Sequence, residues 1–252
     1  STVTTIKAIA SNHQREKVNL SIKAKYVFVC AGAIYTPFLL KRSGLNHNIG
    51  NSLSLHPTIK TLCLFDKAIN QNPSAVPLCA ITEFMPNKRI GGSVFNPGFF
   101  AMSVAEDWDN RAWLLDKAER CGIYYAMIKP TGTGKVRAIT GMPDPIVSFT
   151  LTKADWQNLS SGLSALAQAM FAADAQNVYP SIKGHAGWQN LKQAKEYLTD
   201  NLPVKNSFLM TIHLFSSCPL GENKQLCATD SFGKVHQMNI LYIADASLIP
   251  EA

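Results

Sequence analysis

Hydrophobic and polar residues alternate differently in the middle of the chain and at its two ends. Near the start, two short alternating runs, residues 3–9 and 18–22, flank a polar turn and predict two strands. Residues 26–33 are continuously apolar, which predicts a strand buried on both faces of a parallel or mixed sheet. A short helix is expected next, with Pro37 near its first turn and Gly44 just beyond its end.

Between residues 58 and 203 the pattern changes to short alternating runs separated by Pro, Gly and Asn, which predicts an antiparallel sheet. The runs are residues 61–65, 80–84, 124–128, 135–139 and 146–151. Residues 153–175 form the clearest predicted helix, because large apolar residues recur in it at helical spacing and mark its core face. These residues are Trp156, Leu159, Leu163, Leu166, Met170 and Phe171.

The last part of the chain returns to the first pattern. Residues 209–213 predict a strand that ends on His213, residues 216–221 a loop of small residues, and residues 240–247 a second buried strand. The sequence therefore predicts an α/β fold in which residues 1–59 and 206–252 build one domain. An antiparallel-sheet domain with helices, residues 60–205, is inserted between them.

Composition narrows the class of protein. The 252 residues are 46% hydrophobic and 16% charged, as in globular proteins, and no apolar run is long enough to span a bilayer. The net charge of +7 is scattered as single residues and pairs without interleaved aromatics, which argues against nucleic-acid binding.

The six cysteines show no CxxC spacing, so we expect neither a metal site nor a redox dithiol. Cys30 and Cys63 lie in apolar runs and are expected to be buried thiols. A Cys218–Cys227 pair is an alternative to reduced thiols, and reduced thiols favour a cytoplasmic location.

Residues 130–134 (PTGTG) look like part of a phosphate-binding loop. Val136 stands where that motif has Ser or Thr, and Lys129 where it has its first Gly, so the motif is rejected.

Three other segments form an ordered set. The first is GAIYTP (32–37) with a leucine-rich stretch, SGL (43–45), IGNSL (49–53) and HP (56–57). The second is His213 followed by SSCPLG (216–221), and the third is LYIADASLIP (241–250). In this order the segments resemble the C-terminal half of the glucose-methanol-choline oxidoreductase family.

The chain departs from the family pattern at several positions. Ser216-Ser217 replaces Gly-Thr, Pro219-Leu220 replaces Arg-Met, and Asn46 and Gln237 replace Gly. The family's glycine-rich GxGxxG turn, and the segment that carries a second catalytic His or Asn, have no counterpart in these 252 residues.

The resemblance implies an FAD cofactor and assigns roles to particular residues. Ala31 and Gly32 would let the cofactor approach the backbone, because a larger side chain there would collide with it. Asp245 would bond a ribityl hydroxyl or orient a backbone N–H, and the amides of Ala246 and Ser247 would face the pyrophosphate. The alternative is that residues 245–247 merely cap a helix.

His213 is the candidate catalytic base. Oxidation of an alcohol removes a hydride and a hydroxyl proton; the flavin accepts the hydride, and histidine, which titrates near neutral pH, suits the proton. The alternative for His213 is a histidine with a purely structural role. Among the others, His13, His47 and His185 are expected in solvated loops.

The sequence thus predicts an FAD-dependent enzyme that oxidises a CH–OH group to a carbonyl, with oxygen or another electron acceptor reoxidising the flavin. Two alternatives stay open. One is a flavin-containing lyase of the hydroxynitrile-lyase type, and the other is a truncated fragment without activity.

Overall fold

The computed structural model describes residues 5–70, 79–198, 202–236 and 238–250, which form two compact units. Unit 1 combines the described residues of Ser1–Ser54, Thr133–Thr150 and His213–Ala252. Unit 2 combines those of Leu55–Gly132 and Leu151–Ile212. Each unit is therefore assembled from segments that lie far apart in the sequence.

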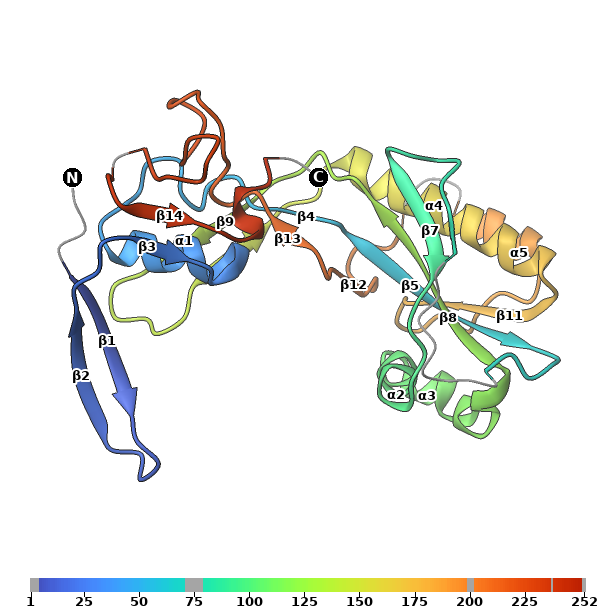
Figure 1. Ribbon diagram of the computed structural model, residues 1–252. Helices are drawn as coiled ribbons and strands as arrows, with labels where there is room; N and C mark the ends of the chain where they lie inside the picture. The colour runs from blue at the N-terminus through green and yellow to red at the C-terminus, as the bar shows by residue number, and fades with distance from the viewer. Residues whose placement is uncertain (1–4, 71–78, 199–201, 237, 251–252) are drawn as a thin grey trace. The chain divides into compact units, whose positions relative to one another are not determined.

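Unit 1 contains two antiparallel hairpins and one parallel strand pair (Figure 1). Its strands are β1 (Ile6–Ser11), β2 (Lys17–Ile22), β3 (Val27–Val29), β9 (Gly134–Arg137), β10 (Ile146–Phe149) and β14 (Leu241–Ile243). Helix α1 (Gly32–Arg42) follows β3, and the short 3-10 helix η2 (Ala246–Leu248) follows β14. The mixed α/β class is confirmed. Of the first predicted strand, Val3 and Thr4 lie outside the described residues, as does Gln237.

The apolar run at residues 26–33 differs from its prediction. Only Val27–Val29 pair as a strand, and Val29 faces the core while Phe28 is 63% exposed. The rings of Phe28 and Tyr242 stack with centroids 5.1 Å apart. Because side chains alternate along a strand, Cys30 falls on the same side as Phe28 and is exposed rather than buried.

Unit 2 is built on a six-stranded sheet in which every pairing is antiparallel. Its order is β11 (Ala175–Pro180), β5 (Thr58–Phe65), β8 (Cys121–Ile128), β7 (Lys88–Gly92) and β6 (Ala80–Ile81), with β12 (Leu209–Met210) also beside β5. Its helices are α2 (Pro97–Ala105), α3 (Trp108–Arg111), the 3-10 helix η1 (Ala112–Arg120), α4 (Lys153–Ala172) and α5 (Leu191–Tyr197). The antiparallel sheet predicted for the middle of the chain is confirmed. Two short strands, β4 (Ser54–Leu55) and β13 (Leu214–Phe215), lie where the chain passes between units.

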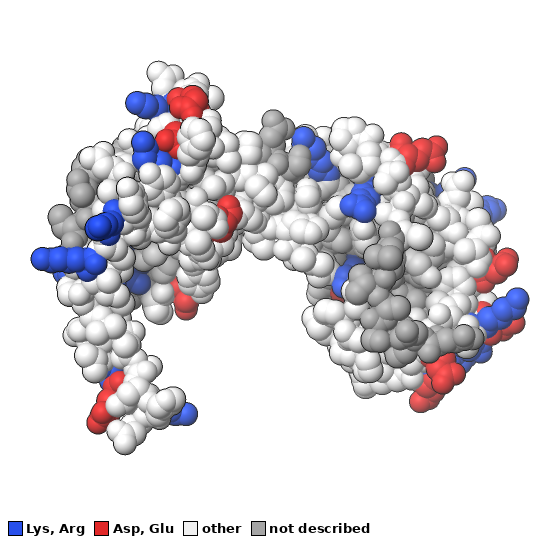
Figure 2. Space-filling view, viewed as in Figure 1, with Lys and Arg blue, Asp and Glu red and all other residues white. Residues whose placement is uncertain are grey.

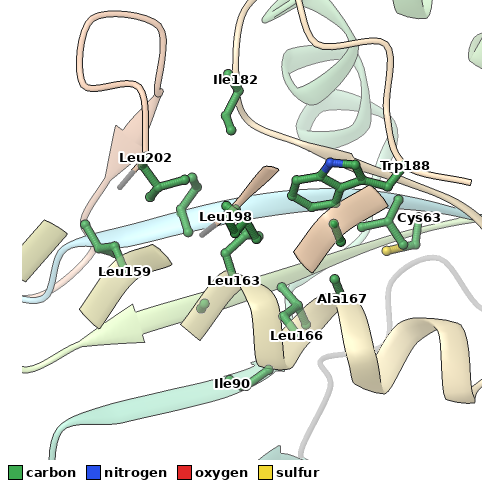
Figure 3. Packing of buried hydrophobic residues seen from close by; sticks show 14 of the residues in the cluster. Cys63, Ile90, Leu159, Leu163, Leu166, Ala167, Ile182, Trp188, Leu198 and Leu202 are labelled. Carbon is green, nitrogen blue, oxygen red and sulfur yellow. The ribbon is translucent and has the colours of Figure 1, made fainter. Parts of the chain in front are cut away.

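Helix α4 provides the main core of unit 2, as its periodicity predicts. Leu159, Leu163 and Leu166 are completely buried and pack with Cys63 of β5 and Ile90 of β7 (Figure 3). At about 25 cal/mol per Å² of apolar area removed from water, burial of this row of leucines stabilises the unit.

The hairpin β9–β10 lies in unit 1, whereas the sequence pattern assigned it to an inserted domain at residues 60–205. The backbone of Gly134 exchanges two hydrogen bonds with Leu53, at 2.7 and 3.0 Å. Val136 is buried in a cluster with Leu53 and Phe38. These long-range contacts, which no local pattern reports, hold the hairpin in unit 1.

Charged side chains are dispersed over the face seen in Figure 2, with Lys and Arg interspersed among Asp and Glu. The described helices include none that is both long and apolar enough to cross a membrane.

The turn at residues 130–132 is held by the carboxylate of Asp155, which is buried in the first turn of α4. Its oxygens accept hydrogen bonds from the N–H groups of Thr131 (2.7 Å), Gly132 (3.0 Å) and Thr152 (2.9 Å). The hydroxyl of Thr152 in turn accepts from the N–H of Asp155, which completes a capping box. The amides that resemble a phosphate loop are thus bound by the protein's own carboxylate.

Burial alone would raise the pKa of Asp155, but its hydrogen bonds from Thr131, Thr152 and Gly132 outweigh burial and lower it. The carboxylate therefore stabilises the fold above about pH 4, and this contribution is lost as the pH falls through the lowered pKa. We expect Asp155→Asn to reduce the free energy of unfolding at pH 7 by about 2–3 kcal/mol, and by less at pH 3. Chemical denaturation at both pH values measures this difference.

Asp174, exposed just after α4, provides the matched control. Asp174→Asn should change the stability at pH 7 by less than about 0.5 kcal/mol. A loss for Asp155→Asn that is the same at pH 3 and pH 7 would contradict the account.

Candidate functional site

The carboxyl ends of the parallel strands β3 and β14 lie side by side in unit 1. The N–H of Ala244 donates to the carbonyl of Val29 at 3.0 Å. Three alanines beyond the strand ends, Ala31, Ala244 and Ala246, are exposed. In open α/β sheets ligands bind at this edge, and a rim of small residues lets a ligand approach the backbone.

Asp245 lies at the centre of this edge and is bonded on both sides. One carboxylate oxygen accepts from the N–H of Gly32 (2.9 Å) and the hydroxyl of Thr36 (2.5 Å), and the other from the N–H of Ser247 (2.8 Å). The same hydroxyl of Thr36 accepts from the N–H of Ala31 at 3.0 Å. Asp245 thus caps η2 and also ties the first turn of α1 to the end of β14.

These contacts show the capping role predicted for residues 245–247 and restrict the cofactor role. The N–H of Ser247 is directed at Asp245, so the expectation that it faces a phosphate is wrong and the capping role is present. Burial would raise the pKa of Asp245, but the hydrogen bonds from Ser247, Thr36 and Gly32 together lower it. The carboxylate is therefore ionised at neutral pH and fixed in orientation.

Gly32 combines an unusual backbone with free space. Its φ is +78°, which disfavours residues with a side chain, and a Cβ atom built there would meet no atom within 4 Å. A side chain here would fill the space in front of the strand ends. Gly32 and Ala31 thus add no bulk at the ends of the two strands.

Helix α1 begins at Gly32, earlier than predicted, so that Pro37 falls inside it. Proline has no N–H, which leaves the carbonyl of Ala33 without its helical donor. The buried hydroxyl of Ser217 donates to that carbonyl at 2.7 Å. The loop at residues 216–221 is thereby fastened to the start of α1.

The same loop runs along η2. The N–H groups of Ser216, Cys218 and Leu220 donate to the carbonyls of Ala246 (3.3 Å), Ser247 (2.9 Å) and Leu248 (3.0 Å), respectively. Ser216 has a φ of +66°, a left-handed conformation that suits glycine. This explains why the family that the sequence resembles has Gly at this position.

His213 precedes this loop by three residues and is exposed. It lies in a non-strand segment between β12 and β13, so the strand predicted at residues 209–213 ends earlier, at Met210. The bonds of Ser216 anchor the segment that carries His213 beside η2. His185, expected in a solvated loop, is instead half-buried with its ring 4.5 Å from that of Tyr197.

Burial raises the pKa of the Cys218 thiol to about 12, so it stays protonated and is a poor nucleophile. All six cysteines are free. In the described ranges, no group of three His, Cys, Asp or Glu side chains is placed to hold a metal ion.

Sequence reasoning missed two residues that organise the site, Thr36 and Ser217. The signal for Thr36 was a hydroxyl close to the start of a helix, where side chains commonly bond the free backbone N–H groups, as Thr36 does with Ala31. Ser217 carried no comparable local signal, because its partner Ala33 lies 184 positions away.

Comparison with known proteins gives matches to a single family along most of the chain. Two models of the same family, both described as GMC oxidoreductase, match residues 3–58 and 130–252. An uncharacterised GMC-type oxidoreductase, y4nJ of Sinorhizobium fredii, is 52% identical over 235 residues, which are 93% of this chain and 46% of that protein. The long-chain-alcohol oxidase FAO1 of Arabidopsis thaliana is 28% identical in an alignment 272 residues long. The alignment covers 97% of this chain and 35% of that protein.

Among solved structures, pyridoxine 4-oxidase from Mesorbium loti has a TM-score of 0.62 at 15% identity. The match covers 99% of this chain and 50% of that one, and it shows a shared fold. The chain thus spans about half the length, or less, of the relatives it matches.

The left-handed conformation of Ser216 leads to a stability test. Ser216→Ala and Ser216→Gly both remove the hydrogen bond from the Ser216 hydroxyl to the carbonyl of Pro250, but only Ala keeps a Cβ atom. We expect the Gly variant to be more stable than the Ala variant by about 1 kcal/mol in chemical denaturation. An Ala variant as stable as the Gly variant would show that this conformation carries no strain.

Proposed function

Because the chain belongs to the glucose-methanol-choline (GMC) oxidoreductase family, we propose that it is part of an FAD-dependent enzyme that oxidises the CH–OH group of an alcohol to a carbonyl. The observation that carries this proposal is the joining of three distant segments in unit 1. The strand ends at Ala31 and Asp245 and the loop after His213 are bonded to one another through Thr36, Ser217 and Ser216. A cofactor edge and a candidate base are thereby held on one framework.

The residues at the strand ends fit a flavin nucleotide. Gly32 leaves open space where a Cβ atom would point, and Ala31 and Ala246 present no bulk. In the proposed complex, Ala31 and Gly32 line the cofactor, while Asp245 fixes the backbone that faces it and Ala246 lies at the rim. When bound, the flavin supplies a hydride acceptor at N5.

His213 is proposed to take the proton of the substrate hydroxyl. Its imidazole is exposed, on a short segment whose far end is anchored at Ser216, so it is accessible to a substrate. Removing the hydroxyl proton raises the electron density on the oxygen and favours departure of a hydride from the same carbon.

The family models and the relatives named as alcohol oxidases support an oxidoreductase over the lyase alternative. We assign alcohol binding to unit 2, which is the antiparallel-sheet domain of the chain. Oxygen or another electron acceptor would reoxidise the flavin.

Replacing His213 tests the proposed base in the complete protein. We expect His213→Ala to keep the flavin absorbance but to slow anaerobic reduction of the flavin by alcohol about 10²- to 10⁴-fold, because the proton loses its acceptor. Stopped-flow absorbance measures the rate.

His13, in the exposed turn between β1 and β2, is the control. His13→Ala should reduce its flavin at the wild-type rate. Reduction at the wild-type rate in His213→Ala would refute the assignment of the base, and carbonyl release without flavin reduction would favour a lyase.

A further inference from the structure

The sheet of unit 2 has one face fully covered and one face partly open. Helix α4 packs on the first face, over Ile59 and Ala126. On the second face, α2 and η1 cover the part of β5 and β8 that carries Leu62 and Ile123 (Figure 1). Because opposite residues in antiparallel strands point to the same face, the strand registers identify what remains uncovered.

Register places five side chains in that uncovered part, which we call the open sheet face. They are Thr58 and Lys60 of β5, Tyr125 and Met127 of β8, and Met210 of β12; Arg89 of β7, the register partner of Met127, points to the same face and is exposed. All five are half-exposed, whereas Leu62 and Ile123 farther along the same strands are buried. The open sheet face is therefore mainly apolar, with Lys60 within it and Arg89 at its β7 side.

Tyr125 leaves the lysine accessible. Its register partner on β7 is Gly91, and a Cβ atom built on Gly91 would lie 2.9 Å from the hydroxyl oxygen of Tyr125. The ring therefore extends over β7, on the side of β8 away from Lys60. Glycine at position 91 makes room for this orientation.

Lys60 is an unusual residue for the central strand of a sheet. Its Nζ lies 5.2 Å from the ring centroid of Phe99, a cation–π contact. No hydrogen bond or ion pair joins Nζ to a residue in the described part of the chain. Burial lowers the pKa of Lys60, while the charge of Glu106 acts in the opposite direction. A half-buried ammonium normally has an oxygen acceptor, and the described residues of the protein supply none to Lys60.

The nearby carboxylate of Glu106 forms an ion pair with another residue. It lies 3.8 Å from the guanidinium of Arg111, which is buried. Arg111 also donates to the carbonyl of Pro180 at 2.5 Å, so this pair fastens α3 to the end of β11. The negative charge of Glu106 favours the protonated form of Lys60. No hydrogen bond or ion pair joins the two side chains in the described residues.

We propose that the open sheet face binds the substrate and that Lys60 selects alcohols that carry an oxyanion, a carboxylate or a phosphate, on an apolar body. This inference rests on the proposed function, because it assigns substrate binding to unit 2. The oxyanion supplies the acceptor that Lys60 lacks, while Tyr125, Met127 and Met210 contact the apolar body. A neutral alcohol would leave the ammonium desolvated and unpaired, which gives discrimination against it.

The test uses the complete flavin-loaded protein and two matched pairs of probes. The binding pair is 4-methylbenzoate and 4-methylbenzamide, titrated by calorimetry, which requires no turnover. The reaction pair is 4-(hydroxymethyl)benzoate and 4-(hydroxymethyl)benzamide, followed by flavin reduction. The variants are Lys60→Met, Lys60→Arg and Lys195→Met, the last removing an exposed lysine from α5, which packs against α4.

We expect the wild type to bind and to oxidise the carboxylate with an affinity or KM better by about 10- to 100-fold than the amide. Lys60→Met should abolish this preference, whereas Lys60→Arg and Lys195→Met should retain it. Equal binding of the two probes by the wild type, a preference that persists in Lys60→Met, or no binding of either probe would each overturn the inference.

The two hypotheses fail separately. A carboxylate preference that depends on Lys60, in a protein whose flavin no alcohol reduces, would support the anion site and refute the proposed function. If neutral and anionic alcohols reduced the flavin equally well, with or without Lys60, the proposed function would be supported and the anion site refuted.

Discussion

The arrangement of unit 1 depends on a single carboxylate and the groups that donate to it. Asp245 receives hydrogen bonds from Gly32 and Thr36, which lie 213 and 209 positions away in the sequence. Strands β3 and β14 share only three pairs of residues, so their pairing alone does not determine how the following helices leave the sheet. The partly buried hydrogen bonds of Asp245 add this constraint, because a carboxylate withdrawn from water is costly unless its acceptors are satisfied.

A second consequence follows for the loop after His213. Pro37 removes a donor from α1, and Ser217 supplies one from a distant segment, so a local defect in the helix becomes an attachment point. Ser216 adopts a left-handed backbone conformation, and its N–H is bonded to the carbonyl of Ala246 in η2. The loop after His213 is thus hydrogen-bonded both to α1 and to η2, the two helices that Asp245 also joins. Unit 2 uses a similar device, since the carboxylate of Asp155 joins its turn at residues 130–132 to α4.

The parts of this fold that sequence predicts are those governed by local burial. The leucine spacing of α4 identifies both a helix and its buried face, and the alternating runs identify the antiparallel strands of unit 2. The membership of β9–β10 in unit 1 depends on backbone bonds between Gly134 and Leu53, for which no side-chain pattern exists. The exposure of Phe28 could not be predicted either, because a continuous apolar run does not indicate whether both faces of its strand are covered. For Asp245 the sequence left two roles open, and the structure shows capping together with the bond to Gly32.

In the proposed enzyme, the Thr36–Asp245 hydrogen bond positions the backbone that would receive FAD. The most direct test of this role is the dissociation constant of FAD from the complete protein with Thr36→Val and Thr36→Ser. Valine matches the shape of threonine without its hydroxyl, so we predict binding weaker by about tenfold or more, with affinity retained in the serine variant. Wild-type FAD affinity in a folded Thr36→Val protein would contradict the account.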